Sequence, residues 1–188
     1  MTITLEPVRP DEHSVLLHGW IPHPRSVYWE MPEATVEEVA RDYRLVDEHA
    51  HHDAWLGRVD GDPVFLAETY DPAYSALAGL EELRPGDLGM HVLVAPPERP
   101  VPGLTRRVFR AVLEHCFADP AVLRVVVDPD VRNDKILALN AFGGFVVSRT
   151  VTLPTKEAAL SFCTREDFAR SPLARGADRS HDGGSHDG

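Results

Sequence analysis

The chain has 188 residues, of which 43% are hydrophobic and 26% are charged. This length suits one domain of ordinary size, and this balance is typical of a soluble globular protein rather than a disordered, fibrous or membrane protein. The 19 Lys and Arg residues against 30 Asp and Glu residues give a formal net charge of −11. We therefore expect no nucleic-acid or anionic-membrane partner, because such ligands need a basic face, and we expect a cationic small molecule instead.

The hydropathy predicts where the protein is located, and the two cysteines argue against a zinc site and a disulfide. No apolar run approaches the roughly 20 residues of a membrane span. The opening residues, MTITLEP, lack the basic and apolar regions of a signal peptide. A cytoplasmic protein is therefore expected. Cys116 and Cys163 lie far apart without ligand spacing, which predicts two buried hydrophobic side chains rather than a zinc site or a disulfide.

In the first half of the chain, strand and helix patterns alternate. Strands are expected over 3–8, 53–59 and 63–70, and helices over 12–18 and from Thr35 to about Ala50. Thr35 and Glu38 have the spacing of a capping box. Asp60-Gly61-Asp62 predicts a hairpin turn. Two prolines within 19–25 exclude a regular helix there, so a loop with large side chains is expected.

The second half is expected to hold a loop over 71–86, strands over 88–94, 123–127, 145–153 and 157–164, and two helices. The first helix has an apolar stripe from Val108 to Cys116. The second begins at the N-cap Asn133 and ends at Gly143-Gly144. Residues 171–188 are polar and are predicted to form a disordered tail with solvated His181 and His186, which leaves one domain over 1–170.

This order of elements predicts an α/β (α+β) fold in which crossover connections join parallel strands. Such crossovers are right-handed and leave a ligand cleft at the carboxyl ends of the linked strands. His91, within the 88–94 strand, shares a side with Gly89 and Leu93. Asp130 directly follows the 123–127 strand. If the two strands are parallel neighbours, His91 and Asp130 face one acceptor pocket from adjacent walls.

Six short motifs together resemble one known family. They are Leu17-His-Gly-Trp20, Pro24-Arg25 with Tyr28-Trp29, Gly86-Asp-x-Gly-x-His91-Val-Leu, Val127-Asp-Pro-Asp130-Val-Arg-Asn133-Asp-Lys135, Gly144-Phe145 and Leu153-Pro-x-Lys156. The set resembles the acyl-CoA-dependent GNAT N-acyltransferases of siderophore biosynthesis, and is most similar to the enzymes that acylate N-hydroxycadaverine in desferrioxamine pathways. The resemblance implies a mixed central sheet of about seven strands flanked by about four helices.

The resemblance also implies roles for the two pocket residues. His91 would contact the acceptor and Asp130 would accept its proton, and the reverse assignment stays open. The plainer interpretation is that Asp130 or Asn133 caps a helix while His91 is a satisfied core histidine. Asp128, Arg132 and Asp134 are expected to serve local turns and ion pairs.

Acetyl-CoA or succinyl-CoA is the acyl donor that the resemblance implies, with no metal. The expected coenzyme-binding residues are Val92, Val94, Arg99, Gly103, Leu104, Thr105, Arg106, Asn133 and Asn140. Two positions depart from the family pattern. In the turn that holds pyrophosphate only Gly103 is in place, with Thr105 where a smaller residue is usual, and Asn140 stands where a general-acid tyrosine is common.

The acceptor wall is expected in the loop between the first two helices. Its residues are Trp20, His23, Arg25, Tyr28 and Trp29, with His91 opposite. Aromatic walls suit a flexible alkyl diamine, although the tryptophans equally suit simple packing of the loop. The run His49-x-His51-His52 is expected to be solvated rather than to bind a metal.

The function expected from these observations is acylation of the hydroxylamine nitrogen of N-hydroxycadaverine or N6-hydroxylysine, which gives a siderophore hydroxamate. One alternative is a GNAT acetyltransferase for another small amine, an aminoglycoside or a polyamine. Another alternative is a non-catalytic CoA-binding module, because the degenerate Gly103 turn departs from the family pattern.

Overall fold

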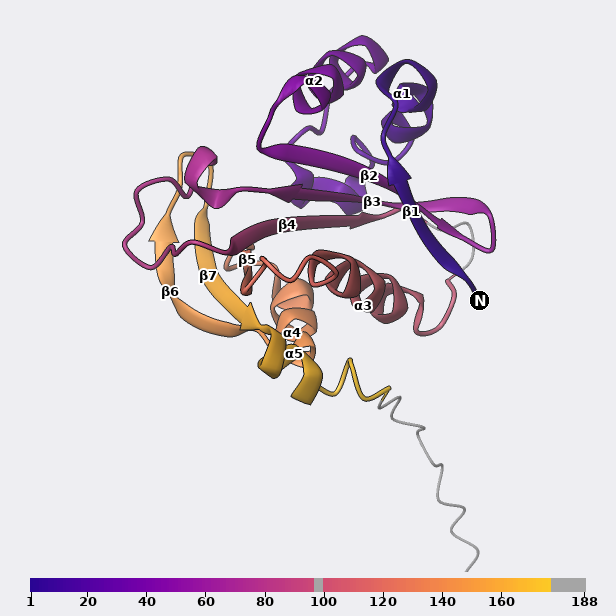
Figure 1. Ribbon diagram of the computed structural model, residues 1–188. Coiled ribbons are helices and arrows are strands. Elements are labelled where there is room, and N and C mark those ends of the chain that lie inside the picture. The colour runs from indigo at the N-terminus through magenta and orange to yellow at the C-terminus, as the bar shows by residue number, and fades with distance from the viewer. Residues whose placement is uncertain (97–99, 177–188) are drawn as a thin grey trace, which may run out of the picture.

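Seven strands form one mixed sheet in the computed structural model, which describes residues 1–96 and 100–176 (Figure 1). The strand order is β1-β2-β3-β4-β5-β7-β6. Every neighbouring pair is antiparallel except β4 and β5, which run parallel. The strands are β1 (Ile3–Pro7), β2 (His52–Val59), β3 (Asp62–Tyr70), β4 (Asp87–Val94), β5 (Arg124–Val127), β6 (Val146–Thr152) and β7 (Glu157–Thr164).

Helices cover both faces of this sheet. They are α1 (Pro10–His18), η1 (Pro24–Trp29), α2 (Val36–Glu48), η2 (Pro72–Tyr74), α3 (Leu104–Cys116), α4 (Asp134–Gly143) and α5 (Arg165–Arg170), of which η1 and η2 are 3-10 helices. Figure 1 shows α1 and α2 on one side of the sheet and α3, α4 and α5 on the other. No helix within the described ranges is long and apolar enough to cross a membrane.

Local signals place most elements where the sequence predicts them. The capping box at the start of α2 is complete, because Thr35 Oγ1 accepts from the Glu38 amide and Glu38 accepts from the Thr35 amide. The β2–β3 turn has positive φ at Asp60 (51°) and Gly61 (96°), as a tight hairpin turn requires. Asn133 caps α4. These predictions are confirmed. Each of these features depends only on residues that are close together in the sequence, so each can be predicted from it.

The C-terminal part contains the two predicted strands, β6 and β7, which pair with each other, and adds features that the sequence did not predict. β7 inserts between β5 and β6, so the last two strands do not follow chain order in the sheet. A short helix, α5, follows β7 behind a second capping box, made by Thr164 and Asp167. The packed chain also extends past the predicted boundary at 170, since Ser171 and Leu173 are only 4% exposed. The rest of the predicted tail, with His181 and His186, lies outside the described residues.

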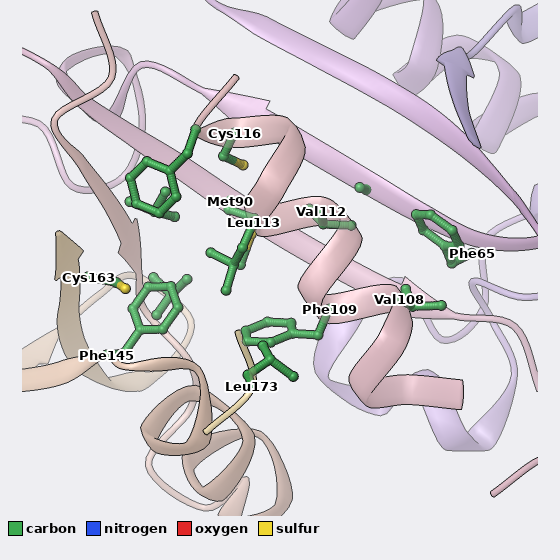
Figure 2. Packing of buried hydrophobic residues seen from close by; sticks show 14 of the residues in the cluster. Phe65, Met90, Val108, Phe109, Val112, Leu113, Cys116, Phe145, Cys163 and Leu173 are labelled. Atoms are coloured by element: carbon green, nitrogen blue, oxygen red, sulfur yellow. The ribbon is translucent and has the colours of Figure 1, made fainter. Parts of the chain in front are cut away.

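Apolar clusters on the two faces of the sheet hold the layers together. Below the sheet, the stripe of α3 packs against β4, β5 and β7, and Figure 2 shows Val108, Phe109, Val112, Leu113 and Cys116 pointing into this cluster. Above the sheet, α1 and α2 pack against a second cluster from β2, β3 and β4. Burying each of these large side chains contributes about 1.5–3 kcal/mol. Both cysteines are buried and free, which confirms their prediction as core residues.

The parallel pair in the middle of the sheet opens a gap. β4 and β5 are paired from Asp87–Arg124 to Gly89–Val126. β4 continues to Val94 and stays paired with β3 on its other side. Beyond Gly89 the two parallel strands therefore separate at their carboxyl ends, where sheets of this kind place their ligands.

Candidate functional site

A cavity of about 450 Å³ lies where β4 and β5 separate. Its walls come from η1, α2, β3, β4, the segment after β5, and α4. The residues predicted from the sequence that line it are His91, Asp130, Val92, Val94, Asn133, Asn140, Arg25, Tyr28 and Trp29. His91 and Asp130 thus face one cavity, as their predicted strand positions required.

Other predicted residues lie elsewhere. Trp20 is 8% exposed and packs in the core beneath α1 and α2, so packing rather than acceptor binding explains it. His23 caps η1 by accepting from the Arg25 amide at 3.1 Å. Neither side chain is part of the cavity wall. Arg99 lies outside the described residues.

Tertiary contacts hold η1 as one wall of the cavity. The Tyr28 hydroxyl donates to the Arg132 carbonyl at 3.2 Å, and Thr155 Oγ1 donates to Glu30 Oε2 at 2.8 Å. A second hollow of about 360 Å³, lined by Tyr28, Glu30, Asp130 and Arg132 among others, adjoins this wall. The loop predicted to carry large side chains is therefore tied to the segments after β5 and β6, and its aromatic rings at 28 and 29 face the site.

His91 stands between two carboxylates. Its Nδ1 lies 3.2 Å from Glu68 Oε2, and its Nε2 lies 3.2 Å from the Tyr70 hydroxyl and 3.6 Å from Asp128 Oδ1. The side chain is 41% exposed, and the Trp29 ring meets it edge-on at 6.1 Å between centroids. His91 is therefore a bonded histidine whose ring is partly open to the cavity, rather than a core residue.

Asp128 is the carboxylate on the Nε2 side of His91. It is 7% exposed, accepts from the Tyr70 hydroxyl at 3.1 Å and pairs with Lys156 Nζ at 3.2 Å. Asp128 was expected to serve local turns and ion pairs, and it does form an ion pair, with a lysine distant in the chain. The chain after β5 stays beside β7, with the Ala159 amide bonded to the Pro129 carbonyl. This continued pairing aims Asp128 at the cavity.

Asp130 has a different environment. Its carboxylate accepts from the Arg132 amide at 2.8 Å and is bound by the Arg132 guanidinium, with Nη2 2.5 Å from Oδ2. No hydrogen bond or ion pair joins Asp130 to His91 in the ranges the structure describes. The two predicted catalytic residues thus share a cavity wall without touching, and the Asp130–Arg132 ion pair matches the role expected for Arg132.

Four participants were given no role in the site from the sequence: Glu68, Tyr70, Tyr43 and Lys156. Glu68 interrupts the apolar strand VFLAETY on the same side as Leu66 and Tyr70. A carboxylate on the buried side of a strand requires partners. That pattern was the available signal for Glu68, and Lys156 closes the Leu153-Pro-x-Lys156 motif, whereas nothing local marks Tyr43.

The charged side chains around His91 lie close together and shift one another's pKa values. Burial lowers the pKa of His91, but hydrogen bonds to Asp128 and Glu68 and the charges of both carboxylates raise it to about 9. Burial raises the pKa of Glu68, but hydrogen bonds from His52 and His91 bring it down to about 2. Hydrogen bonds from Arg132 lower the pKa of Asp130 to about 2. At neutral pH, His91 is therefore a cation between two anions.

Asn140 presents unused polar atoms to the other end of the cavity. It is 3% exposed, and within the described ranges neither its Oδ1 nor its Nδ2 has a hydrogen-bond partner. Leaving such an amide unpaired costs about 1–3 kcal/mol, which a polar ligand in the cavity would recover. Val92 and Val94 line the same region, where β4 has separated from β5.

The N-terminus of α3, the helix that contributes Phe109 to the cavity wall, carries positive charge. Gly103 has a φ of 74°, and its conformation starts the helix without a side-chain cap. Thr105 and Arg106 are exposed, Arg106 lies over the Phe142 ring at 4.6 Å, and Arg107 packs beside Gly103. Leu104 instead belongs to the core. Free amides, the helix dipole and two arginines together suit a phosphate group.

The histidine run does not form a metal site in the described part of the chain. No group of three or more His, Cys, Asp or Glu side chains there has the arrangement to hold a metal ion. His51 stacks on Tyr74 at 3.7 Å between centroids, and His52 Nε2 lies 3.5 Å from Glu68 Oε2. The run is thus partly packed, with His52 joined to the cluster around His91.

Comparisons with known proteins agree with this geometry. A family model described as an acetyltransferase (GNAT) domain matches residues 9–153. The aminoglycoside N(6′)-acetyltransferase type 1 of Klebsiella pneumoniae is 28% identical over 168 residues, covering 85% of this chain and 83% of the relative. The N-hydroxyputrescine acetyltransferase of Acinetobacter baumannii is 28% identical over 155 residues, covering 81% of this chain and 73% of the relative.

A solved structure gives the same architecture. The structure of AAC(6′)-Ib in complex with ribostamycin and coenzyme A superposes with a TM-score of 0.80 at 26% identity, covering 90% of this chain and 97% of that one. The seven-stranded sheet and its flanking helices therefore form a fold that holds coenzyme A in a similar chain.

Proposed function

Because the chain belongs to the GNAT acetyltransferase family, which uses acetyl-CoA as acyl donor, we propose that it acylates the hydroxylamine nitrogen of an N-hydroxylated diamine. N-hydroxycadaverine is the acceptor that we favour, and the product is a hydroxamate. The relative that acetylates N-hydroxyputrescine, a shorter homologue of the same diamine, supports this class of acceptor.

The observation that carries the proposal is that each buried carboxylate lining the cavity is bound by a cation. Glu68 is bound by His91, Asp128 by Lys156 and Asp130 by Arg132. None is a free base of the strength that an alkylammonium, with a pKa near 10.4, requires. At pH 7 only roughly one such amine in 2,500 is neutral. A hydroxylamine is already largely neutral and needs no deprotonation before attack.

The residues present suit acyl-CoA. The Gly103 turn with Arg106 and Arg107 would hold its phosphates, and Asn140, Val92 and Val94 would line the channel for its pantetheine arm. Acyl-CoA bound there would supply the acyl group for the transfer. The fit of Asn140 is supported by its two unpartnered buried polar atoms within the described ranges.

The protein's own side chains then position the acceptor. Trp29 and Tyr28 form an aromatic wall for the alkyl chain, and His91 supplies a positive charge in a fixed position beside the reacting nitrogen. Once the C–N bond forms, the nitrogen's proton becomes strongly acidic, so a weak carboxylate base suffices to accept it. Asp128 is the nearer candidate because it bonds to the same cluster, and Asp130 remains the second.

A panel of acceptors tests this proposal. N-hydroxycadaverine, N6-hydroxylysine and cadaverine are assayed side by side with acetyl-CoA and succinyl-CoA, following thiol release and product mass. The neutral fraction favours the hydroxylamine by about 10³ at pH 7, and the higher basicity of an amine offsets part of this. We expect kcat/KM to be at least tenfold higher for N-hydroxycadaverine than for cadaverine. Equal values would contradict the proposal.

A second candidate function is N-acetylation of an aminoglycoside. It is favoured by the 28% identity over most of the chain to aminoglycoside N(6′)-acetyltransferases. Two carboxylates of the cavity wall, the exposed Glu30 and the half-buried Asp42, offer negative charge to a polycationic acceptor. Kanamycin added to the same panel separates the two functions: turnover of kanamycin without hydroxamate formation would establish this candidate. Thermal stabilisation by CoA without turnover of any acceptor would instead indicate a non-catalytic module.

A further inference from the structure

Glu68 is a buried carboxylate that the proposed reaction does not use directly. It lies within β3, is 8% exposed, and has a partner on every side. Oε1 accepts from the Tyr43 hydroxyl of α2 at 2.8 Å. Oε2 lies 3.2 Å from His91 Nδ1 and 3.5 Å from His52 Nε2. A desolvated carboxylate costs several kcal/mol unless its bonds are completed, so its retention on this strand needs a reason.

The strand register determines which group Glu68 meets. Glu68 is directly opposite His91 in the β3–β4 pair, and the adjacent pair on the same side is Tyr70 with Gly89. Directly opposite side chains in a sheet lie close enough to interact. A Cβ at Gly89 would stand 2.2 Å from the Tyr70 ring, so only glycine leaves room for Tyr70 to reach Asp128 and His91 Nε2. The sheet itself thus presents one acceptor to each nitrogen of His91.

Two acceptors require two N–H groups on the ring. Tyr70 donates its proton to Asp128, because burial and the Asp128 charge raise the pKa of Tyr70 well above 10. Its oxygen is then free to accept from His91 Nε2, while Glu68 accepts from Nδ1. A neutral imidazole carries only one proton and would leave one of these contacts unmade. The geometry therefore favours the doubly protonated ring.

We propose that Glu68 is a positioning residue for the acyl transfer: it accepts the Nδ1 hydrogen of His91 and so holds the imidazolium in a fixed orientation and charge state beside the acceptor. This inference rests on the proposed function, in which His91 faces the acceptor. The Tyr43 hydroxyl of α2 fixes Glu68 in turn by a hydrogen bond, and His52 of β2 lies beside it. Glu68 itself acts only through His91.

The environment of His91 supports this role. The groups that face the cluster are Glu68 and Tyr70 from β3, His52 from β2, Tyr43 from α2, and Asp128 with its partner Lys156 after β5 and β6. Two of the group are carboxylates, and one of these, Asp128, is shared with Lys156. Removing the charge of Glu68 removes the carboxylate that serves His91 at Nδ1, so the pKa of His91 should fall.

The test compares Glu68→Gln with Glu6→Gln in the full chain. Glu6 is a matched control, because it pairs with Arg58 on the β1–β2 edge and lies outside the cavity wall. The His91 ring is titrated by NMR, with its resonance assigned by its loss in His91→Ala. We expect Glu68→Gln to lower the pKa of His91 by at least about one unit and kcat/KM about tenfold, with an unchanged KM for acetyl-CoA. Glu6→Gln should change neither.

Tyr43→Phe keeps the carboxylate and removes one hydrogen bond from it. This second variant should lower the pKa of His91 less than Glu68→Gln does. If Glu68→Gln fails to fold, the His91 titration in Tyr43→Phe still tests whether Glu68 controls the pKa of His91. An unchanged pKa of His91 in a folded Glu68→Gln protein would overturn the inference, even if activity fell. The titration needs no acceptor, so absence of turnover on every hydroxylamine would refute the proposed function while leaving the link between Glu68 and His91 measurable.

Discussion

Replacing His91 by alanine is expected to lower kcat/KM for the N-hydroxylated acceptor by about 10². Fixed charge and hydrogen bonds aimed at a reacting centre in a partly desolvated site are worth this much in other enzymes. His91 supplies the cation between Glu68 and Asp128 at the point where β4 and β5 separate. Steady-state kinetics with N-hydroxycadaverine and acetyl-CoA measure the effect.

The fold of this variant should survive. Glu68 keeps the Tyr43 hydroxyl and His52, and Asp128 keeps Tyr70 and Lys156. Circular dichroism and coenzyme binding serve as controls, and both should match the wild type. A folded, coenzyme-binding His91→Ala protein with wild-type kcat/KM would show that His91 plays no part in the reaction.

The raised pKa of His91 also predicts a pH dependence of stability. In the unfolded chain the group titrates near 6.5, and in the folded protein near 9. Protonation therefore favours the folded state: the contribution is fully present below about pH 6.5 and is lost as the pH rises through about 9. The Tm difference between wild type and His91→Ala should shrink from pH 6 to pH 9.5. A difference independent of pH would mean that folding does not raise the pKa of His91.

Asp128→Asn is the second change with a large expected effect, about 10² in kcat/KM. The substitution removes the charge that pairs with Lys156 and His91 and leaves the lysine without its ionic partner. Breaking a buried pair from one side costs about 3–5 kcal/mol, so the unfolding free energy must be measured beside the kinetics. Asp130→Asn should lower kcat/KM only about tenfold, because its carboxylate is bound to Arg132 rather than to His91.

The variant with the larger loss of kcat/KM, Asp128→Asn or Asp130→Asn, identifies the carboxylate that accepts the proton. Asp134→Asn provides a matched control on the same connection, since Asp134 is exposed in the first turn of α4 and outside the cavity wall. It should leave kcat/KM unchanged. If Asp130→Asn proves the more damaging change in a folded protein, the assignment of Asp130 as proton acceptor, expected from the resemblance, is restored.

Sequence motifs named several residues that the structure brings together in one cavity. His91 and Asp130 were expected on adjacent walls because they lie in or after two strands joined by one crossover helix, and both line the cavity. Trp20 was grouped with Tyr28 and Trp29 by proximity in sequence, yet it packs into the core. The residues next to a tryptophan in the sequence do not reveal whether its ring points into the core or into a cavity, because that depends on the elements packed beneath the loop.

The elements with local signals could be read from the amino-acid sequence: the capping box of α2, the Asp60-Gly61 hairpin, the apolar stripe of α3 and the Asn133 cap of α4. These depend on hydrogen bonds and side-chain spacing within a few residues. Three other features became visible in the folded chain alone: β7 inserts beside β5, Glu68 stands opposite His91, and Asp128 rather than Asp130 completes the cluster. Those pairings depend on strand register and on the separation of β4 from β5, which arise from contacts between segments distant in the chain.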